Sequence, residues 1–262
     1  MGTNWKMNKN FAQAQEYVDE LINLVSTHRQ FSYFIIPPYT HLNDIKQQLK
    51  NSDIMLGAQN MHWATQGAYT GEISPRWLSD VGVNIALLGH SERRQYYNEN
   101  DAHLNKKVHS ALEYGMTALL CVGEYQEDKK FGVTSEVIRR QIKIGLFNIE
   151  PQNLEKVWVA YEPVWAIGEK GTPADPDYVE GVHLVIREQL LELFGNAGEK
   201  VSILYGGSVN VENCVSLSKR KNVDGLFIGR SAWDILTFKK IVELLLKADV
   251  GTSNKAGRSL YE

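Results

Sequence analysis

A glutamate followed by a proline is the first candidate catalytic position in the sequence. The β-branched and aromatic run Val157–Tyr161 predicts a strand, which stops at Glu162 because the next residue is proline. Proline cannot donate to a sheet, so the carboxylate is expected at the rim of that sheet. Gly168 and Gly171 follow between two prolines, a composition typical of a lid with stiff ends. A carboxylate beside a lid indicates an enclosed proton-transfer site, although a solvated charge at a strand end is the more frequent case for such a residue alone.

A histidine stands at the end of another predicted strand. His90 follows the apolar run Ile85–Leu88 and precedes Ser91 and Glu92. The segment after His90 is expected to turn helical, so its ring can receive backbone N–H groups and the positive end of a helix. Both effects disfavour the imidazolium and predict a neutral ring. For an isolated histidine, a buried structural role is the alternative.

Two polar residues near the start of the chain complete the candidate chemistry. Asn4 and Lys6 follow a very short first strand, and Glu92 is a candidate salt-bridge partner for Lys6. The alternative for Lys6 is a surface lysine whose aliphatic stem covers apolar neighbours. Its place at a strand end, rather than on a helix face, favours a functional role.

Glycine-rich turns follow the last two predicted strands. Gly206-Gly207-Ser208 comes after Ser202–Tyr205, and Gly229-Arg230 comes after Leu226–Ile228. Either turn alone is explained as a tight connection. Two such turns on neighbouring strands match the position at which barrels of parallel strands hold a phosphate on backbone N–H groups.

The elements that must position these residues alternate between strand and helix. Counting the opening segment, eight predicted strands are each followed by a helix, and the strands are apolar on both faces, which predicts a parallel sheet. Eight such units in about 250 residues predict one (β/α)₈ barrel with an unusually short first strand. An open doubly wound sheet is the runner-up, but no strand is followed by the glycine pattern of a dinucleotide site. We expect residues 1–250 to form a single domain and the polar tail 251–262 to be frayed.

Local sequence patterns predict the bounds of the individual strands and helices. The predicted strands beyond the opening segment are 33–36, 54–58, 85–88, 117–122, 157–161, 202–205 and 226–228. The predicted helices are 11–26, one capped by Thr40 and ending near Leu49, one capped by Ser74, then 101–114, 134–147, one capped by Asp175, 213–218 and 236–247.

Bulk composition excludes several classes of protein. The 262 residues are 43% hydrophobic with a formal net charge of −3, which gives no case for binding nucleic acid or an anionic membrane surface. Cys121 and Cys214 are too few for a disulfide framework and form no metal-ligand spacing with the histidines. Neither a secretory leader nor a long apolar run is found, so the prediction is a cytoplasmic protein.

Several motifs together resemble those of the triosephosphate isomerase family, and the likeness runs from the first residues to the last helix. The matching segments are Asn4–Asn8, Gly57–Glu72, Gly89–Arg94, Tyr161–Gly168 and Tyr205–Val209. This family is a known example of a glutamate base paired with a neutral histidine.

The resemblance implies roles for individual residues. Glu162 is implied as the base and His90 as the electrophile, Asn4 and Lys6 as substrate ligands, and Ser91 and Glu92 as further members of the catalytic set. Phosphate donors are implied at Gly168, Ser208, Gly229 and Arg230. A homodimer is implied, with Thr70 at the tip of a loop, Gln59–Ile73, that reaches the partner's site. No metal or organic cofactor is expected.

The implied reaction interconverts dihydroxyacetone phosphate and D-glyceraldehyde 3-phosphate through an enediolate. The lid sequence Gly168–Pro173 and the arginine at position 230, where the family usually has a second glycine, depart from the usual pattern. These departures, with Phe227 and Ser231–Trp233, resemble isomerases of four-carbon sugar phosphates such as L-erythrulose 1-phosphate. If position 230 needs a positive φ, its arginine would be strained. The three-carbon substrate is favoured, the four-carbon substrate is the rival, and a non-catalytic barrel that only binds is a third alternative.

Overall fold

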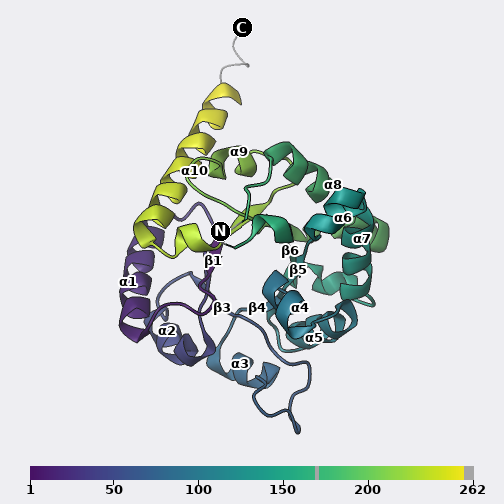
Figure 1. The fold of residues 1–262 in the computed structure, drawn as a ribbon. Coiled ribbons are helices and arrows are strands. Elements are labelled where there is room, and N and C mark those ends of the chain that lie inside the picture. Colours follow the sequence, from purple (N-terminus) through teal and green to yellow (C-terminus); the bar gives the residue numbers. More distant parts are fainter. Residues whose placement is uncertain (169–170, 257–262) are drawn as a thin grey trace.

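A computed structural model describes residues 1–168 and 171–256, and it shows a closed barrel of eight parallel strands surrounded by helices (Figure 1). Each strand pairs with its neighbours in sequence order, and β1 pairs with β8 to close the ring. The strands are β1 (Gly2–Asn4), β2 (Phe34–Ile36), β3 (Met55–Ala58), β4 (Ile85–Leu88), β5 (Thr117–Val122), β6 (Val157–Tyr161), β7 (Ser202–Tyr205) and β8 (Gly225–Ile228). The predicted (β/α)₈ barrel is therefore confirmed.

The helices lie outside the strands and connect each one to the next (Figure 1). They are α1 (Phe11–Thr27), α2 (Leu42–Gln48), α3 (Pro75–Val81), α4 (Ser91–Tyr97), α5 (Asp101–Glu113), α6 (Gln126–Phe131), α7 (Thr134–Gly145), α8 (Pro176–Phe194), α9 (Cys214–Ser218) and α10 (Ile235–Ala256). Short 3₁₀ turns are η1 (Tyr39–His41), η2 (Pro151–Lys156), η3 (Val164–Ala166), η4 (Gly195–Lys200) and η5 (Arg230–Ala232).

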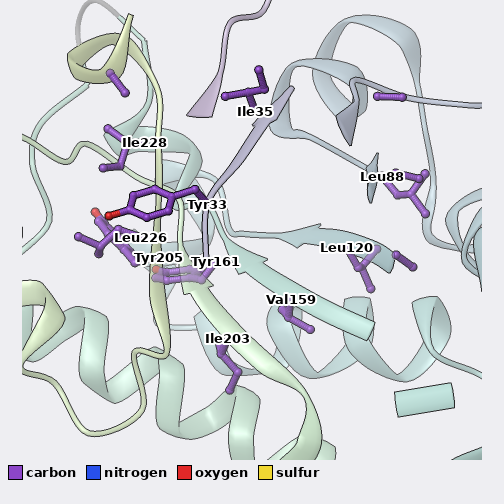
Figure 2. Packing of buried hydrophobic residues seen from close by; sticks show 14 of the residues in the cluster. Tyr33, Ile35, Leu88, Leu120, Val159, Tyr161, Ile203, Tyr205, Leu226 and Ile228 are labelled. Carbon is purple, nitrogen blue, oxygen red and sulfur yellow. The ribbon is translucent and has the colours of Figure 1, made fainter. Parts of the chain in front are cut away.

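The strands are apolar on both faces because each face packs against a different layer. Ile35 points outward and joins the large cluster shared with the helices, part of which Figure 2 shows, whereas its neighbours Phe34 and Ile36 belong to the interior of the barrel. Alternation along a strand sends successive side chains to opposite faces, so two buried layers leave no polar face. The polar residues therefore collect where the strands end.

The first strand is short, as predicted, and its interior side is filled by a neighbour. β1 has three residues and registers with β2 at all three positions but with β8 at only Gly2 and Thr3. A Cβ at Gly2 would meet the ring of Phe34, so only glycine fits there. Phe34 in turn stacks on Phe227 of β8, and both aromatic rings belong to the buried cluster in the interior of the barrel.

Two of the three predicted N-caps, those of Ser74 and Asp175, are confirmed, and two predicted helix bounds are wrong. The Ser74 hydroxyl accepts from the amide of Arg76, and Asp175 accepts from the first amides of α8, as predicted. Thr40 does not cap a helix, because it lies inside η1 and α2 begins only at Leu42. The last helix does not end near Lys247, because α10 continues to Ala256 and includes the first part of the segment predicted to fray. The remaining tail residues, 257–262, lie outside the described residues, as do Glu169 and Lys170 of the predicted lid.

Candidate active site

A cavity of about 260 Å³ opens at the carboxyl ends of the strands and contains eight of the ten predicted site residues. The other two, Ser91 and Glu92, hydrogen-bond to residues that line it. The structure therefore brings together in one place all the residues that the sequence singled out. Those in the lining are Asn4, Lys6, His90, Glu162, Gly168, Ser208, Gly229 and Arg230.

Glu162 is a buried carboxylate held at the rim of β6. Its side chain is 2% exposed, and its Oε2 accepts from the amide of Ser91 at 3.0 Å. Its Oε1 lies 3.5 Å from Nε2 of His90. Burial, and then the negative charge of Glu162 nearby, raise the pKa of the Cys121 thiol well above its ordinary value, so this thiol stays protonated. Of these two neighbouring groups, only the Glu162 carboxylate is a candidate proton acceptor.

His90 stands immediately before α4, and its ring caps that helix. The Nδ1 atom accepts from the amide of Glu92 at 3.2 Å, so in this arrangement Nδ1 carries no proton and Nε2 does. The Nε2–H faces the Glu162 carboxylate across the 3.5 Å gap. The predicted helix start after His90 is confirmed, and the bond to its first turn supports the neutral tautomer that the sequence suggested.

Lys6 is paired and its backbone is strained. Its Nζ lies 2.7 Å from Oε1 of Glu92, as the sequence suggested. Its φ of 53° is in the left-handed region, which costs a residue with a side chain about 1–2 kcal/mol. Hydrogen bonds on both sides hold this conformation, because the amide of Lys6 donates to Asn4 Oδ1 at 2.8 Å and its carbonyl accepts from Gln59 Nε2 at 2.7 Å. The supporting role of Gln59 was not predicted.

The opposite wall of the cavity is built from the two glycine-rich turns. Gly207 can carry no side chain, because a Cβ there would meet the Tyr205 hydroxyl. Arg230 opens η5, whose first amides are available as donors to an anion. Arg230 is not among the residues with positive φ, so its backbone does not carry the strain that the sequence raised as a possibility. Its exposed guanidinium has no hydrogen-bond or ion-pair partner in the described part of the chain.

A second buried carboxylate, which the sequence reasoning missed, anchors the segment around the lid. Glu124 follows β5 and is fully buried, and it accepts from Tyr161 at 3.1 Å, from Nε1 of Trp165 at 2.8 Å and from Tyr178 at 2.8 Å. Burial raises the pKa of Tyr178 to about 12 and raises the pKa of Tyr161 well above its ordinary value, so both phenols keep the protons that they donate. The rule that found Glu162, a carboxylate just after a strand, would also have found Glu124.

This carboxylate ties together both ends of the predicted lid. Trp165 lies in η3 just before the lid, and Tyr178 lies in the first turns of α8 just after it. The ammonium of Lys129 lies 3.4 Å from the centroid of the Trp165 ring and adds a cation–π contact. Gly168, at the start of the lid, has a φ of 89°, a conformation that favours glycine. Fixed ends with a permissive residue between them agree with the composition noted in the sequence.

Neither a metal cluster nor a membrane-spanning helix is found in the described part of the chain. Among residues 1–168 and 171–256, no group of three or more His, Cys, Asp or Glu residues is arranged to hold a metal ion. Over the same ranges, no helix combines the length and apolar character needed to cross a membrane.

Comparison with known proteins agrees with this geometry. Residues 1–245 match the family model described as triosephosphate isomerase. The chain is 42% identical over 251 residues to the L-erythrulose-1-phosphate isomerase of Rhizobium meliloti, covering 95% of this chain and 97% of that protein. It is 44% identical over 242 residues to the triosephosphate isomerase of Treponema denticola, covering 92% of this chain and 96% of that protein. The chain is thus an isomerase of phosphosugars and belongs to the triosephosphate isomerase family.

Proposed function

We propose that this enzyme interconverts dihydroxyacetone phosphate and D-glyceraldehyde 3-phosphate by proton transfer through an enediolate. The observation that carries the proposal is the convergence of Glu162, His90 and Lys6 on one cavity, with backbone donors on its opposite wall. These groups supply a base, a hydrogen-bond donor to an oxygen and a fixed positive charge, which is what the isomerisation of an α-hydroxy ketone requires.

The proposed steps follow from the contacts. The Glu162 carboxylate leaves the Ser91 amide and takes a proton from the carbon beside the substrate carbonyl. The electron pair of that C–H bond forms the enediolate, and the Nε2–H of His90 donates to the oxygen on which negative charge develops. The Lys6 ammonium offsets this charge. Glu162 then returns the proton to the neighbouring carbon, while His90 transfers a proton between the two oxygens.

The opposite wall of the cavity and the lid have separate tasks in this proposal. Backbone N–H groups at Gly168, Ser208, Gly229 and Arg230 hold the phosphate, which fixes the carbon chain relative to Glu162. The lid excludes water, which strengthens the electrostatic interactions within the site and keeps the enediolate from expelling its phosphate.

The experiment is a comparison of initial isomerisation rates on dihydroxyacetone phosphate and L-erythrulose 1-phosphate at matched concentrations. A kcat/KM for the triose near the diffusional ceiling of about 10⁸–10⁹ M⁻¹s⁻¹ would support the proposal. A weak triose rate beside a strong tetrulose rate would refute the three-carbon assignment and leave the proton-transfer mechanism in place.

A four-carbon ketose phosphate is the second candidate, and Arg230 is the observation that favours it. L-Erythrulose 1-phosphate bears a hydroxymethyl group on the carbon that would lose the proton, so its recognition needs polar contacts that the triose does not use. The unpartnered guanidinium of Arg230 lies in the lining of the cavity and can supply such contacts, to this group or to the phosphate. The similar protein of Rhizobium meliloti is named for this substrate.

Replacing the arginine tests the second candidate. If Arg230 selects the larger substrate, Arg230→Gly should lower kcat/KM for L-erythrulose 1-phosphate about tenfold or more relative to dihydroxyacetone phosphate. An unchanged ratio of the two values would exclude any role of Arg230 in substrate choice. Lys221→Gly is a matched control, because it removes an exposed cation from outside the cavity.

We also propose that the enzyme is a homodimer through the loop Gln59–Ile73. In support, Tyr69 and Thr70 at the tip of this loop are exposed, and Met7, close to Lys6, is 96% exposed. Exposed apolar side chains next to a site are typical of a surface that a partner covers. Sedimentation equilibrium should give twice the mass of the chain, and Thr70→Arg should lower the mass and the activity together. A monomer with full activity would refute the proposal.

A further inference from the structure

Trp233 completes the barrel at the point where β1 and β8 stop pairing. The register between these strands ends at Thr3 and Ile228, one residue before Asn4. On the side facing β2, the backbone continues to pair, because the amide of Trp5 donates to the carbonyl of Ile36. On the side facing β8, the carbonyl of Asn4 accepts instead from the indole Nε1 of Trp233 at 2.9 Å. A side chain thus replaces the backbone bond at this seam, which we define as the contact between Asn4 and Trp233.

The seam is linked to Lys6 by consecutive hydrogen bonds. The indole fixes the backbone of Asn4, and the side chain of Asn4 accepts from the amide of Lys6 at 2.8 Å. Lys6 adopts a left-handed φ of 53°, so it reverts to an ordinary conformation unless such bonds oppose the change. The next carbonyl along, that of Trp5, accepts from the side chain of Asn8 at 2.9 Å. The polar groups around the strained residue are therefore satisfied largely by side chains.

Trp233 is itself fixed from the other side. Lys9 Nζ donates to its carbonyl at 2.7 Å, and the hydroxyl of Tyr17 donates to the carbonyl of Ala232 at 2.6 Å. Its amide donates to Arg230 at the start of η5. Trp233 is also among the residues that line the cavity, as are Asn4 and Lys6. Its position is thus determined by Lys9, by Tyr17 of α1 and by the turn that carries Arg230.

We infer that Trp233 is a positioning residue, which holds the Lys6 ammonium at the substrate through its indole bond to the Asn4 carbonyl. The inference rests on the phosphosugar isomerisation proposed above and adds a residue to it. Because the ammonium interacts with a dianionic substrate and with the enediolate, a loosened Lys6 weakens the binding of both. A residue that merely stabilised the barrel would lower the melting temperature and leave the affinity of the folded enzyme unchanged.

The test is a double-mutant cycle on ligand affinity. Trp233→Phe keeps an aromatic ring and removes the N–H, and Lys6→Ala removes the cation. The probe is 2-phosphoglycolate, a carboxylate that resembles an enediolate phosphate, with its dissociation constant measured by calorimetry. We expect Trp233→Phe to weaken the binding of 2-phosphoglycolate about tenfold and to lower kcat/KM about tenfold. When Lys6 is already alanine, the same substitution should change the affinity by less than twofold. Trp158→Phe is the matched control, because Trp158 lines a separate cavity with Met1 and Gly225 at the start of the strands.

Each outcome decides the inference. Additive effects of the two substitutions would show that Trp233 does not act through Lys6, and an unchanged affinity in Trp233→Phe with a lowered melting temperature would assign it a structural role only. If Trp233→Phe does not fold, Lys9→Met takes its place, because it removes the hydrogen bond from Lys9 Nζ to the carbonyl of Trp233. This variant should also bind 2-phosphoglycolate more weakly. Should the unmodified enzyme bind 2-phosphoglycolate yet turn over neither sugar phosphate, the proposed function fails, while the cycle still tests the role of Trp233.

Discussion

Gly206 is the position at which one added methyl group should disable Glu162, the proposed base, without disturbing the fold. Gly206 follows β7, and its amide donates to the carbonyl of Tyr161 at 2.8 Å. It is not among the glycines with positive φ, so alanine fits the backbone. A Cβ built there lies 2.9 Å from Cγ of Glu162 and 3.5 Å from Cδ1 of Phe227. The substitution Gly206→Ala therefore presses on the side chain of the base.

The size of the effect follows from these distances. Ordinary contacts begin at 3.4 Å, so the Glu162 side chain must shift by about 0.5 Å or more. A misplacement of about 1 Å in a reacting group costs roughly 100-fold in rate. We expect kcat to fall about 10-fold to 100-fold, which corresponds to about 1.4–2.7 kcal/mol of lost transition-state stabilisation. KM should change little, because the new methyl group meets the base and not the phosphate donors.

The assay is steady-state isomerisation of the preferred sugar phosphate, with the melting temperature measured in parallel. Gly181→Ala is the control, because a Cβ at this position in α8 meets no atom within 4 Å and alanine favours a helix by up to about 1 kcal/mol. A Gly206→Ala enzyme with the original kcat and an unchanged melting temperature would refute the reasoning. A fall in kcat matched by the fraction of unfolded protein would refute it equally.

Three further predictions concern catalysis, pH and a buried ion pair. Glu162→Gln should lower kcat by about 10²–10⁴ with the ligand affinity retained, and full activity in this variant would refute the proposed role of Glu162 as the base. Burial lowers the pKa of His183 to about 4, whereas the pKa of a histidine in the unfolded chain is near 6.5. Between pH 6.5 and pH 4 the unfolded chain therefore binds one proton more than the folded protein, and the free energy of unfolding falls as the pH drops through this range. Urea unfolding should show that His183 lowers the free energy of unfolding by about 2 kcal/mol between pH 7 and pH 5, and this loss should disappear in His183→Phe. An equal pH dependence in that variant would contradict the assignment. Lys107→Met removes the ammonium that lies 2.6 Å from Glu99 and leaves that buried carboxylate paired with Arg93 alone, so it should cost about 2 kcal/mol in urea unfolding, with partial recovery in Lys107→Met/Glu99→Gln.

The sequence predicted the strands well because each ends at a strong local signal. Four strands, β4, β5, β6 and β7, have the predicted bounds, and each is a short apolar run stopped by glycine or by Glu162 before proline. The positions of the site residues followed from these ends, since parallel strands in a barrel bring their carboxyl ends to one rim. The cavity that contains Asn4, Lys6, His90 and Glu162 is therefore a consequence of strand ends that can be read locally.

The features that were missed depend on contacts between distant segments. The indole of Trp233 reaches Asn4 across most of the chain, and Gln59 reaches Lys6 from another loop; neither pairing leaves a local pattern. The extension of α10 past Lys247 was missed for a different reason. Its last residues include Gly251 and Ser253, which have low intrinsic helix propensity, so propensity alone predicts an earlier end.

The closure of the barrel between β1 and β8 also has a consequence for synthesis on the ribosome. The bond between Trp233 and Asn4 joins residues 229 positions apart, so β1 cannot meet β8 until the residues between them have been translated. At about 5–20 residues per second, that interval is roughly 10–45 s. During this time the nascent chain exposes an edge of β1 together with the apolar side chains that β8 later covers. Lys6, a proposed substrate ligand, is thus translated long before Trp233, and the arrangement that positions it is completed only once Trp233 has been added.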